Sequence, residues 1–229
     1  MTILTACAFL VALASVARAA DESGDGDPWQ GYNRAVFEFN DTIDRAVLKP
    51  VAEGYQDITP GIIRSSIGNF FGNLDDVDNA VNNSLQGKLG AGLSDVGRVL
   101  VNSTLGVGGL FDIASELGLE KHEEDFGQTL AVWGAPRGPY FVLPFMGPST
   151  VTETLGRPVG SYLDPLRYYE PVHHRNLLFG LRFVDDREGL LSSERLVSGD
   201  RYIFIRDAYL QRRQYLIDDG STIDPFADF

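Results

Sequence analysis

The segment FGQTLAVWGAPRGPYFVLPFMGPSTVT, Phe126–Thr152, carries one formal charge in 27 residues, at Arg137. Four prolines and four glycines interrupt it. Because a proline inside a helix costs about 3 kcal/mol, no single helix, spanning or otherwise, is expected here. Prolines also lack the N–H that a central strand needs. The pattern predicts an irregular, apolar segment rich in large side chains: Trp133, Tyr140, Phe141, Phe145 and Met146.

Two structural interpretations of this segment are open. It is either a buried loop that closes a soluble core, or a wall beside lipid, because irregular backbone survives at membrane depth when it is buried in protein or lines a cavity. In the second interpretation Arg137 faces a polar lumen or a phosphate, which a guanidinium binds with two hydrogen bonds. In the first, Arg137 forms a structural salt bridge with Glu153 or Asp125.

Upstream, a long amphipathic helix is predicted to open at Asp27-Pro28, with Asp27 as its cap, and to stop before Lys49-Pro50. Apolar residues recur every three or four positions, as on one helical face: Trp29, Tyr32, Val36, Phe39, Ile43 and Val47. The helix is long enough to span a bilayer, but five charged residues within it make that too costly. If it meets lipid, it lies in the interface.

The remaining elements are also predicted to be helices, so the fold class is all-α. A helix starts at Thr59-Pro60, and Asp75 or Asp76 caps a separate short one. The next runs over Leu89–Leu105 with Leu93, Val96 and Leu100 directed inward. The last predicted helices are 112–117, one capped by Thr150 with Glu153 and interrupted at Arg157-Pro158, 176–196 and 200–218. Thirteen uncharged residues, 99–111, are too few to span but suit insertion to part depth.

Composition excludes several classes of function. The net charge of −13 argues against a nucleic-acid partner, which requires a basic face. A single cysteine, Cys7, leaves no disulfide and no thiolate metal cluster. His122 lies in a charged turn at 121–125, and His173-His174 are adjacent, so no metal site is predicted. Without a nucleophile elbow, phosphate loop or dinucleotide fingerprint, no catalytic residue and no cofactor are expected.

The first twenty residues are typical of a secretory signal peptide, with an apolar stretch followed by a small-residue cleavage pattern at Ala17, Ala19 and Ala20. Residues 4–7, ending at Cys7, also match a bacterial lipobox, in which that cysteine is lipidated. The two alternatives remain open. Residues 21–27 are expected to form an acidic linker, 28–220 one helical domain, and 221–229 a loose tail.

Five blocks in order along the chain resemble the MlaA family, also called VacJ, of bacterial outer-membrane lipoproteins. They are DPWQGYNRAVFEFNDTIDR (27–45), SIGNFFGNLDDVDNAVNNSLQG (66–87), RVLVNSTLGVGGLFDIA (98–114), FGQTLAVWGAPRGPYFVLPFMGPST (126–150) and DRYIFIRDAYLQRRQYLIDDG (200–220). The resemblance implies a helical ring in the inner leaflet of the outer membrane. It implies a polar-lined channel through which phospholipids leave the outer leaflet for a soluble periplasmic carrier, and association with trimeric porins.

These expectations give a working hypothesis for the lipid path. Residues 134–146 and 99–111 flank it, and Arg137 meets the phosphate. The candidate lipid-channel residues are Arg137, Trp133, Tyr140, Phe141, Phe145, Leu105 and Phe111. Two other classes of function remain open. One is a structural envelope lipoprotein that binds porins without moving lipid. The other is a lipid-modifying enzyme, which is disfavoured because no set of catalytic residues is visible.

Overall fold

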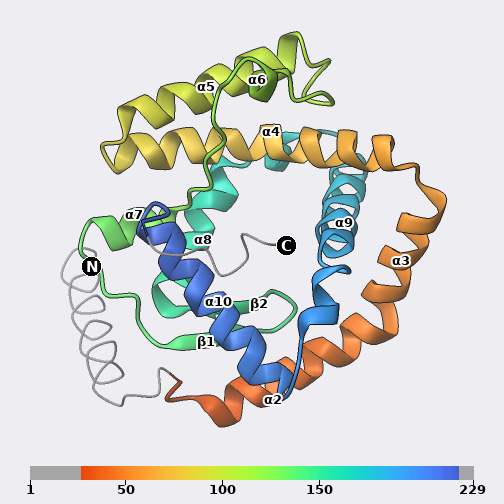
Figure 1. Cartoon of the computed structure of the whole chain (residues 1–229), viewed down its shortest axis with the longest axis vertical. Helices are drawn as coiled ribbons and strands as arrows, with labels where there is room; N and C mark the ends of the chain where they lie inside the picture. Colours follow the sequence, from red (N-terminus) through yellow and green to blue (C-terminus); the bar gives the residue numbers. More distant parts are fainter. Residues whose placement is uncertain (1–26, 222–229) are drawn as a thin grey trace.

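The computed structural model describes residues 27–221, and its helices close into a ring (Figure 1). The ring runs from α2 through η1 and α3 to α4, then through α7 and α10 to a hairpin that packs against α2. The helix pair α5 and α6 lies outside α4, and α9 packs beside α3. The bounds are α2 Gln30–Ile43, η1 Asp44–Leu48, α3 Lys49–Ile58, α4 Gly61–Leu85, α5 Leu89–Thr104, α6 Ile113–Glu116, α7 Phe126–Val132, β1 Tyr140–Leu143, β2 Gly147–Thr150, α8 Val151–Leu163, η2 Pro165–Tyr168, α9 Val172–Gly189, η3 Ser193–Leu196 and α10 Arg201–Ile217.

The predicted all-α class is confirmed, with one short hairpin inside the irregular segment. The signal peptide, the lipobox with Cys7, the cleavage residues Ala17, Ala19 and Ala20, nearly all of the acidic linker and of the tail lie outside the described residues. The single domain over 28–220 stays a proposal.

The predicted stop before Lys49-Pro50 is wrong, because the helix continues from α2 through a π-helical turn into α3. The π turn changes the backbone hydrogen-bond pattern next to Pro50, which has no N–H to donate. Pro50 itself lies in the first turn of α3. Asp27 does not cap α2 with its side chain. It is buried instead, and it accepts hydrogen bonds from Asn33 and from the Tyr202 hydroxyl.

Two other predicted breaks are also wrong. Asp75 and Asp76 lie in the middle of α4, because tertiary ion pairs with Arg182 and Arg98 hold their carboxylates. Likewise, α8 runs through Pro158. There the preceding Arg157 bonds to the Pro148 carbonyl and pairs with Glu153.

Other boundaries agree with the sequence. Thr150 caps α8 by accepting a hydrogen bond from the Glu153 N–H, and Asp200 caps α10 in the same way. The Leu89–Leu105 helix and the short helix after Asp112 are present as α5 and α6. The predicted 176–196 helix is divided into α9, which starts earlier, and η3.

Contrary to the prediction of an irregular segment, β1 and β2 pair as an antiparallel hairpin with Tyr140 opposite Thr150 and Val142 opposite Pro148. Proline is tolerated because both strands of a two-stranded sheet are edges. Asn33 on α2 forms hydrogen bonds with the backbone of β1. Its amide nitrogen donates to the Tyr140 carbonyl, and its oxygen accepts from the Val142 N–H. Asn40, two turns further on, does the same for Leu143 and Phe145 at the hairpin turn.

Candidate functional site

Burial is inverted in this protein: polar side chains are buried between the helices, and many large apolar side chains are exposed. Within residues 27–221, sixteen polar or charged residues are buried but only eight hydrophobic ones, while many large apolar side chains are exposed. A soluble domain normally shows the reverse, since Asn, Asp and Arg seldom leave water unless they are paired. Exposed apolar surface of this extent marks a site of contact with a membrane or with another protein.

Helix α5 shows the inversion most clearly. The predicted inward residues Leu93, Val96 and Leu100 are 72%, 45% and 61% exposed, so that prediction is wrong. The face packed against α4 instead carries Gly92, Asp95, Arg98 and Asn102. A side chain at Gly92 would collide with the Ala80 carbonyl and Ser84 of α4, so glycine permits this close approach.

Arg98, 1% exposed, is the centre of the buried polar interface between α4, α5 and α6. Its Nε lies 3.0 Å from Asp76, which is fully buried, and its Nη2 lies 3.1 Å from both oxygens of Asp112. Burial by itself would raise the pKa of Asp112. Hydrogen bonds from Ser115, Asn102 and Arg98 outweigh this effect and lower the pKa well below its ordinary value. The interface is held by paired charges rather than by apolar packing.

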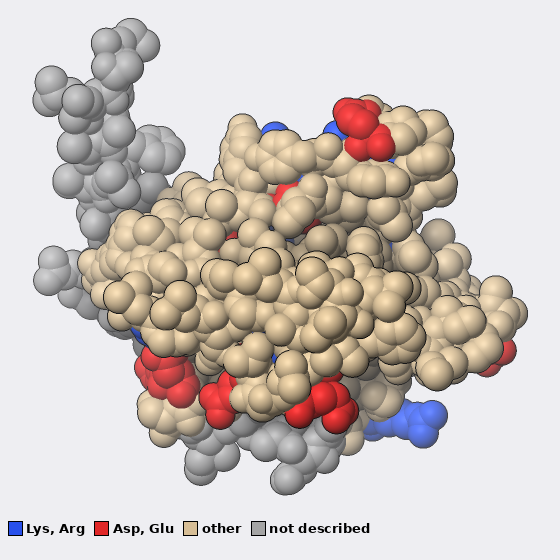
Figure 2. All heavy atoms as spheres, turned by 90° about the horizontal axis from the view of Figure 1, so that it is seen from above, with Lys and Arg blue, Asp and Glu red and all other residues tan. Residues whose placement is uncertain are grey.

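We call the exposed apolar side chains along the outside of the ring the apolar rim. It comprises Trp29, Tyr32, Phe39, Val47, Val51, Ile58, Ile62, Ile63, Leu89, Leu93, Val96, Leu100, Leu105, Val107, Leu110 and Phe111. Figure 2 looks down on α5 and shows a face with few charged side chains; most of the visible acidic ones lie along its lower edge, and another group lies at the upper right. Four residues of the predicted apolar face of α2, Trp29, Tyr32, Phe39 and Val47, are exposed and belong to this rim, whereas Val36 packs against the core with Tyr140 and Tyr202.

None of the helices within 27–221 combines the length and the apolar character that crossing a membrane requires. A continuous apolar rim beside charged edges is instead the pattern of a protein that lies in a membrane interface. Across the same residues, no group of three or more His, Cys, Asp or Glu side chains is placed to hold a metal ion.

The hairpin half of the predicted lipid path lies against α2. The Phe141 ring stacks on Tyr32 at 5.2 Å, and Phe145, 64% exposed, meets Phe39 edge-on at 5.3 Å. Tyr140 points the other way and is 1% exposed, so its side chain belongs to the aromatic core with Tyr202 and Tyr209.

The other candidates are dispersed. Trp133 closes α7, is 56% exposed, and donates from its indole nitrogen to the Leu85 carbonyl at 3.1 Å. Leu105 and Phe111 are exposed on the rim after α5, across α4 from the hairpin (Figure 1). The structure therefore does not bring the two predicted flanks together.

Arg137 lies in the loop before β1 and donates a hydrogen bond to the Gln214 side chain on α10. The two acids expected as its salt-bridge partners are engaged elsewhere. Asp125 pairs with Arg213, and Glu153 pairs with Arg157.

The sequence reasoning missed the buried polar residues. A signal for them exists in DDVDNAVNN, residues 75–83, where acids and amides recur on the buried face of a helix without proline or glycine. Asn33 and Asn40 give a second signal, because a spacing of seven places two amides on one helical face.

Together, the ring, its polar interior and its apolar rim define a helical protein of the membrane interface. The chain belongs to the MlaA lipoprotein family, whose model matches residues 25–216. It is 33% identical over 207 residues to the intermembrane phospholipid transport system lipoprotein MlaA of Escherichia coli K12, covering 87% of this chain and 82% of that one. It is 31% identical over 233 residues to the protein of that name from Haemophilus influenzae, covering 97% and 93%.

A solved structure reported as "Structural basis for maintenance of bacterial outer membrane lipid asymmetry" has the same fold. The TM-score is 0.73 at 34% identity, with 83% of this chain and 98% of that chain covered. An uncharacterised protein of Rickettsia felis is 36% identical over 192 residues, covering 82% of this chain and 76% of that one.

Proposed function

We propose that this protein is the outer-membrane component of a phospholipid transport pathway. It removes mislocalised phospholipid from the outer leaflet and passes it to a soluble periplasmic carrier, which maintains the lipid asymmetry of that membrane. The observation that carries the proposal is the inverted burial in a helical ring, with polar side chains buried between helices and large apolar side chains exposed. Its relatives named as phospholipid transport lipoproteins support the same assignment.

We place the ring in the inner, periplasm-facing leaflet. The apolar rim is suited to the acyl chains, and the acidic edge seen in Figure 2 is suited to water. We propose that polar groups line the opening of the ring, so that a headgroup crosses the leaflet without the cost of moving a charge into hydrocarbon. A trimeric porin and the periplasmic carrier are the proposed protein partners.

Within this function, Arg137 meets the lipid phosphate, and Trp133, Phe141, Phe145, Leu105 and Phe111 contact the acyl chains. A guanidinium carries five N–H donors, so a hydrogen bond to Gln214 is compatible with phosphate binding. Movement of lipid through such a ring needs no chemical step, and we propose that the protein is not an enzyme. Release of a lipid product by the purified protein would contradict this.

The deciding experiment measures outer-leaflet phospholipid with a membrane-impermeant amine label on intact cells. Deletion of the gene should raise labelled lipid, and the wild-type gene should restore it. An unchanged outer leaflet would instead favour the alternative, a structural lipoprotein that binds porins and moves no lipid.

The role of Arg137 has its own test. Arg137→Glu should impair complementation in the labelling assay while the variant accumulates normally in the membrane. Gln214→Ala is the matched control, because it removes one hydrogen bond of Arg137 and keeps the guanidinium. Wild-type transport by a stably expressed Arg137→Glu protein would exclude the role.

A further inference from the structure

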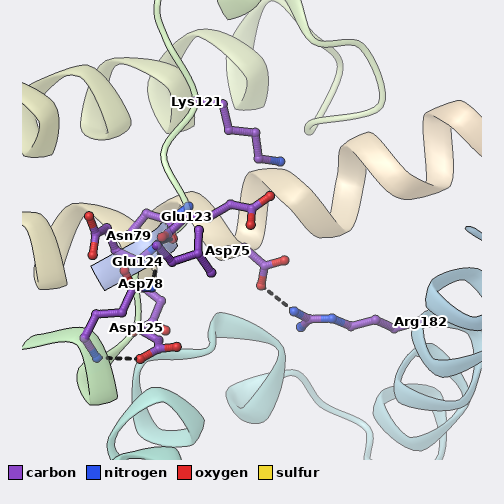
Figure 3. A pocket seen from close by; sticks show the side chains of 10 residues that line it. Asp75, Asp78, Asn79, Lys121, Glu123, Glu124, Asp125 and Arg182 are labelled. Atoms are coloured by element: carbon purple, nitrogen blue, oxygen red, sulfur yellow. Dashed lines mark hydrogen bonds and ion pairs between the residues drawn. The ribbon is translucent and has the colours of Figure 1, made fainter. Parts of the chain in front are cut away.

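The pocket between α4, α9 and the segment before α7 is lined chiefly by acidic side chains, and its arginine is already paired. Figure 3 shows Arg182 directed at Asp75, with which it forms an ion pair. Nothing in that lining points to a ligand. The features that contacts within the chain do not explain lie instead at two exposed loop tips, at Val107 and Phe145.

Both tips hold a bulky apolar residue in a backbone conformation that normally favours glycine. The φ angles of Val107 and Phe145 are +54° and +64°. In this left-handed region Cβ lies too close to the following carbonyl oxygen, and a β-branched or bulky residue is an outlier there. Among the other residues that the structure describes, the only non-glycine residue with a positive φ is Asp219, whose short polar side chain tolerates the region. Val107 and Phe145 therefore strain the folded state.

The same two residues are also largely exposed. Val107 is 61% exposed in the α5–α6 loop, and Phe145 is 64% exposed at the β1–β2 turn. Glycine in either place would relieve the strain and remove apolar surface from contact with water. Within the chain, only the edge-on contact of Phe145 with Phe39 offsets that strain. The gain that keeps these side chains must come from a contact outside the chain.

Hydrogen bonds hold the backbone at both tips. Two residues after Val107, the N–H of Gly109 donates to the carbonyl of the buried Asn102 at 2.8 Å. The N–H of Phe145 donates to the side-chain oxygen of Asn40 on α2 at 2.8 Å. A mobile loop would fold its apolar side chains back onto the protein in water. These anchored tips keep them projecting outward.

Acyl chains are the medium that fits both tips. The α5–α6 loop lies outside α4, whereas the hairpin lies beside α2, so the tips are on different parts of the ring (Figure 1). A single protein partner would have to wrap the ring to reach both, but a bilayer surrounds it. Each tip also continues the apolar rim, because Leu105 and Phe111 flank Val107, and Phe39 lies against Phe145.

We propose that Val107 and Phe145 are rigid wedges that insert between acyl chains and loosen lipid packing around the ring. Loosened packing lowers the cost of drawing a lipid out of the membrane. Attachment to the membrane does not depend on these two side chains, because the rest of the apolar rim supplies it. The inference rests on the proposed function and adds a step to it, in which the protein disorders the lipid that it collects.

The strain is tested by thermal unfolding of the full-length protein in detergent. Val107→Gly should raise the Tm by about 2–6 °C, because glycine adopts a positive φ freely. Leu105→Gly is the matched control, since it removes a 65% exposed apolar side chain from the same loop at a φ of −81°. There glycine should lower the Tm by about 1–4 °C. A Val107→Gly protein that melts at or below the wild-type temperature overturns the inference.

The wedges are tested with the purified protein on vesicles of phosphatidylethanolamine and phosphatidylglycerol, in which Laurdan fluorescence reports lipid order. At equal amounts of bound protein, measured by co-sedimentation, the wild type should lower the order. Val107→Gly combined with Phe145→Gly should lose most of this effect, whereas Val107→Leu with Phe145→Leu should keep it. An undiminished effect of the double glycine variant overturns the inference. If that variant also loses co-purification with a porin, the tips contact a protein instead.

The transport assay separates this inference from the proposed function. If gene deletion leaves the outer leaflet unchanged, the proposed function fails, and the wedges lose their role in transport whatever the vesicles show. If deletion raises outer-leaflet lipid but a stably expressed double glycine variant clears it as fast as the wild type, the transport proposal stands and the wedge inference falls. Slower clearance by a variant that binds vesicles normally supports both.

Discussion

Replacing Asn33 by alanine tests the idea that side-chain amides, rather than apolar contacts, hold the hairpin to α2. Asn33 is fully buried and makes three hydrogen bonds: to Asp27 at 2.7 Å, to the Tyr140 carbonyl at 3.2 Å and from the Val142 N–H at 2.9 Å. One of these bonds involves an acidic side chain, and all three partners lose a bond on truncation.

The expected loss of unfolding free energy is about 3–5 kcal/mol, from about 1 kcal/mol for each neutral bond and about 2 kcal/mol for the charged one. For a chain of this size, at about 2–4 °C per kcal/mol, that lowers the Tm by about 6–20 °C. The assay is thermal unfolding followed by circular dichroism in detergent.

Asn33→Leu keeps the side-chain volume without the hydrogen bonds, so it should lose nearly as much stability as Asn33→Ala. Asn40→Ala loses two bonds at the more exposed hairpin turn and should cost about 1–2 kcal/mol. The reasoning is refuted if Asn33→Ala melts within about 1 °C of the wild type, or if Asn33→Leu restores the stability.

Three further predictions follow from the interior and the rim. Arg98→Ala should destabilise the protein by about 3–5 kcal/mol in denaturant titration, because it leaves the fully buried Asp76 unpaired; a loss below about 1 kcal/mol would contradict this. Burial by itself would raise the pKa of Glu194. Hydrogen bonds from Lys49 and Arg201 and the charge of Arg187 outweigh this effect and lower that pKa from 4.5 to about 2. The unfolded carboxyl therefore binds protons first, and about 1–2 kcal/mol of stability, after solvent screening, should disappear as pH falls from 4.5 towards 2. Glu194→Gln should lack this component in pH-dependent melting, and an identical pH profile would exclude it. Leu93→Glu with Leu100→Glu should keep the Tm, since both side chains are exposed, yet reduce co-sedimentation with phospholipid vesicles; undiminished sedimentation would remove α5 from the lipid-facing rim.

Local signals were sufficient for the helices whose ends carry a local cap. Thr150 before α8 and Asp200 before α10 satisfy backbone N–H groups with their own side chains, so their positions are visible in the sequence. Proline at 50 and 158 misled, because a π turn precedes Pro50 in a continuous helix, and because tertiary contacts of the neighbouring Arg157 hold α8 where it passes Pro158. The aspartates at 75 and 76 misled because a capping residue and a buried ion-pair residue look alike in sequence.

For the functional surface, apolar periodicity grouped the right residues on α5, but the prediction that they point inward was wrong. Periodicity shows that Leu93, Val96 and Leu100 share a face, and it does not show which medium covers that face. Burial of the opposite face, with Arg98 and Asn102, required the contact with α4.

By itself, the sequence determined that this chain is helical, that its helices are amphipathic and too charged to span a membrane, and which family it resembles. These properties depend on composition and on residue spacing within about one helical turn. They are therefore local and do not depend on contacts between distant segments. Tertiary structure alone decided which face of α5 is buried and how Asn33 pairs with a strand more than a hundred residues away. Those outcomes depend on contacts between distant segments. Hydrogen bonds between such segments form only when the ring closes and brings donor and acceptor together.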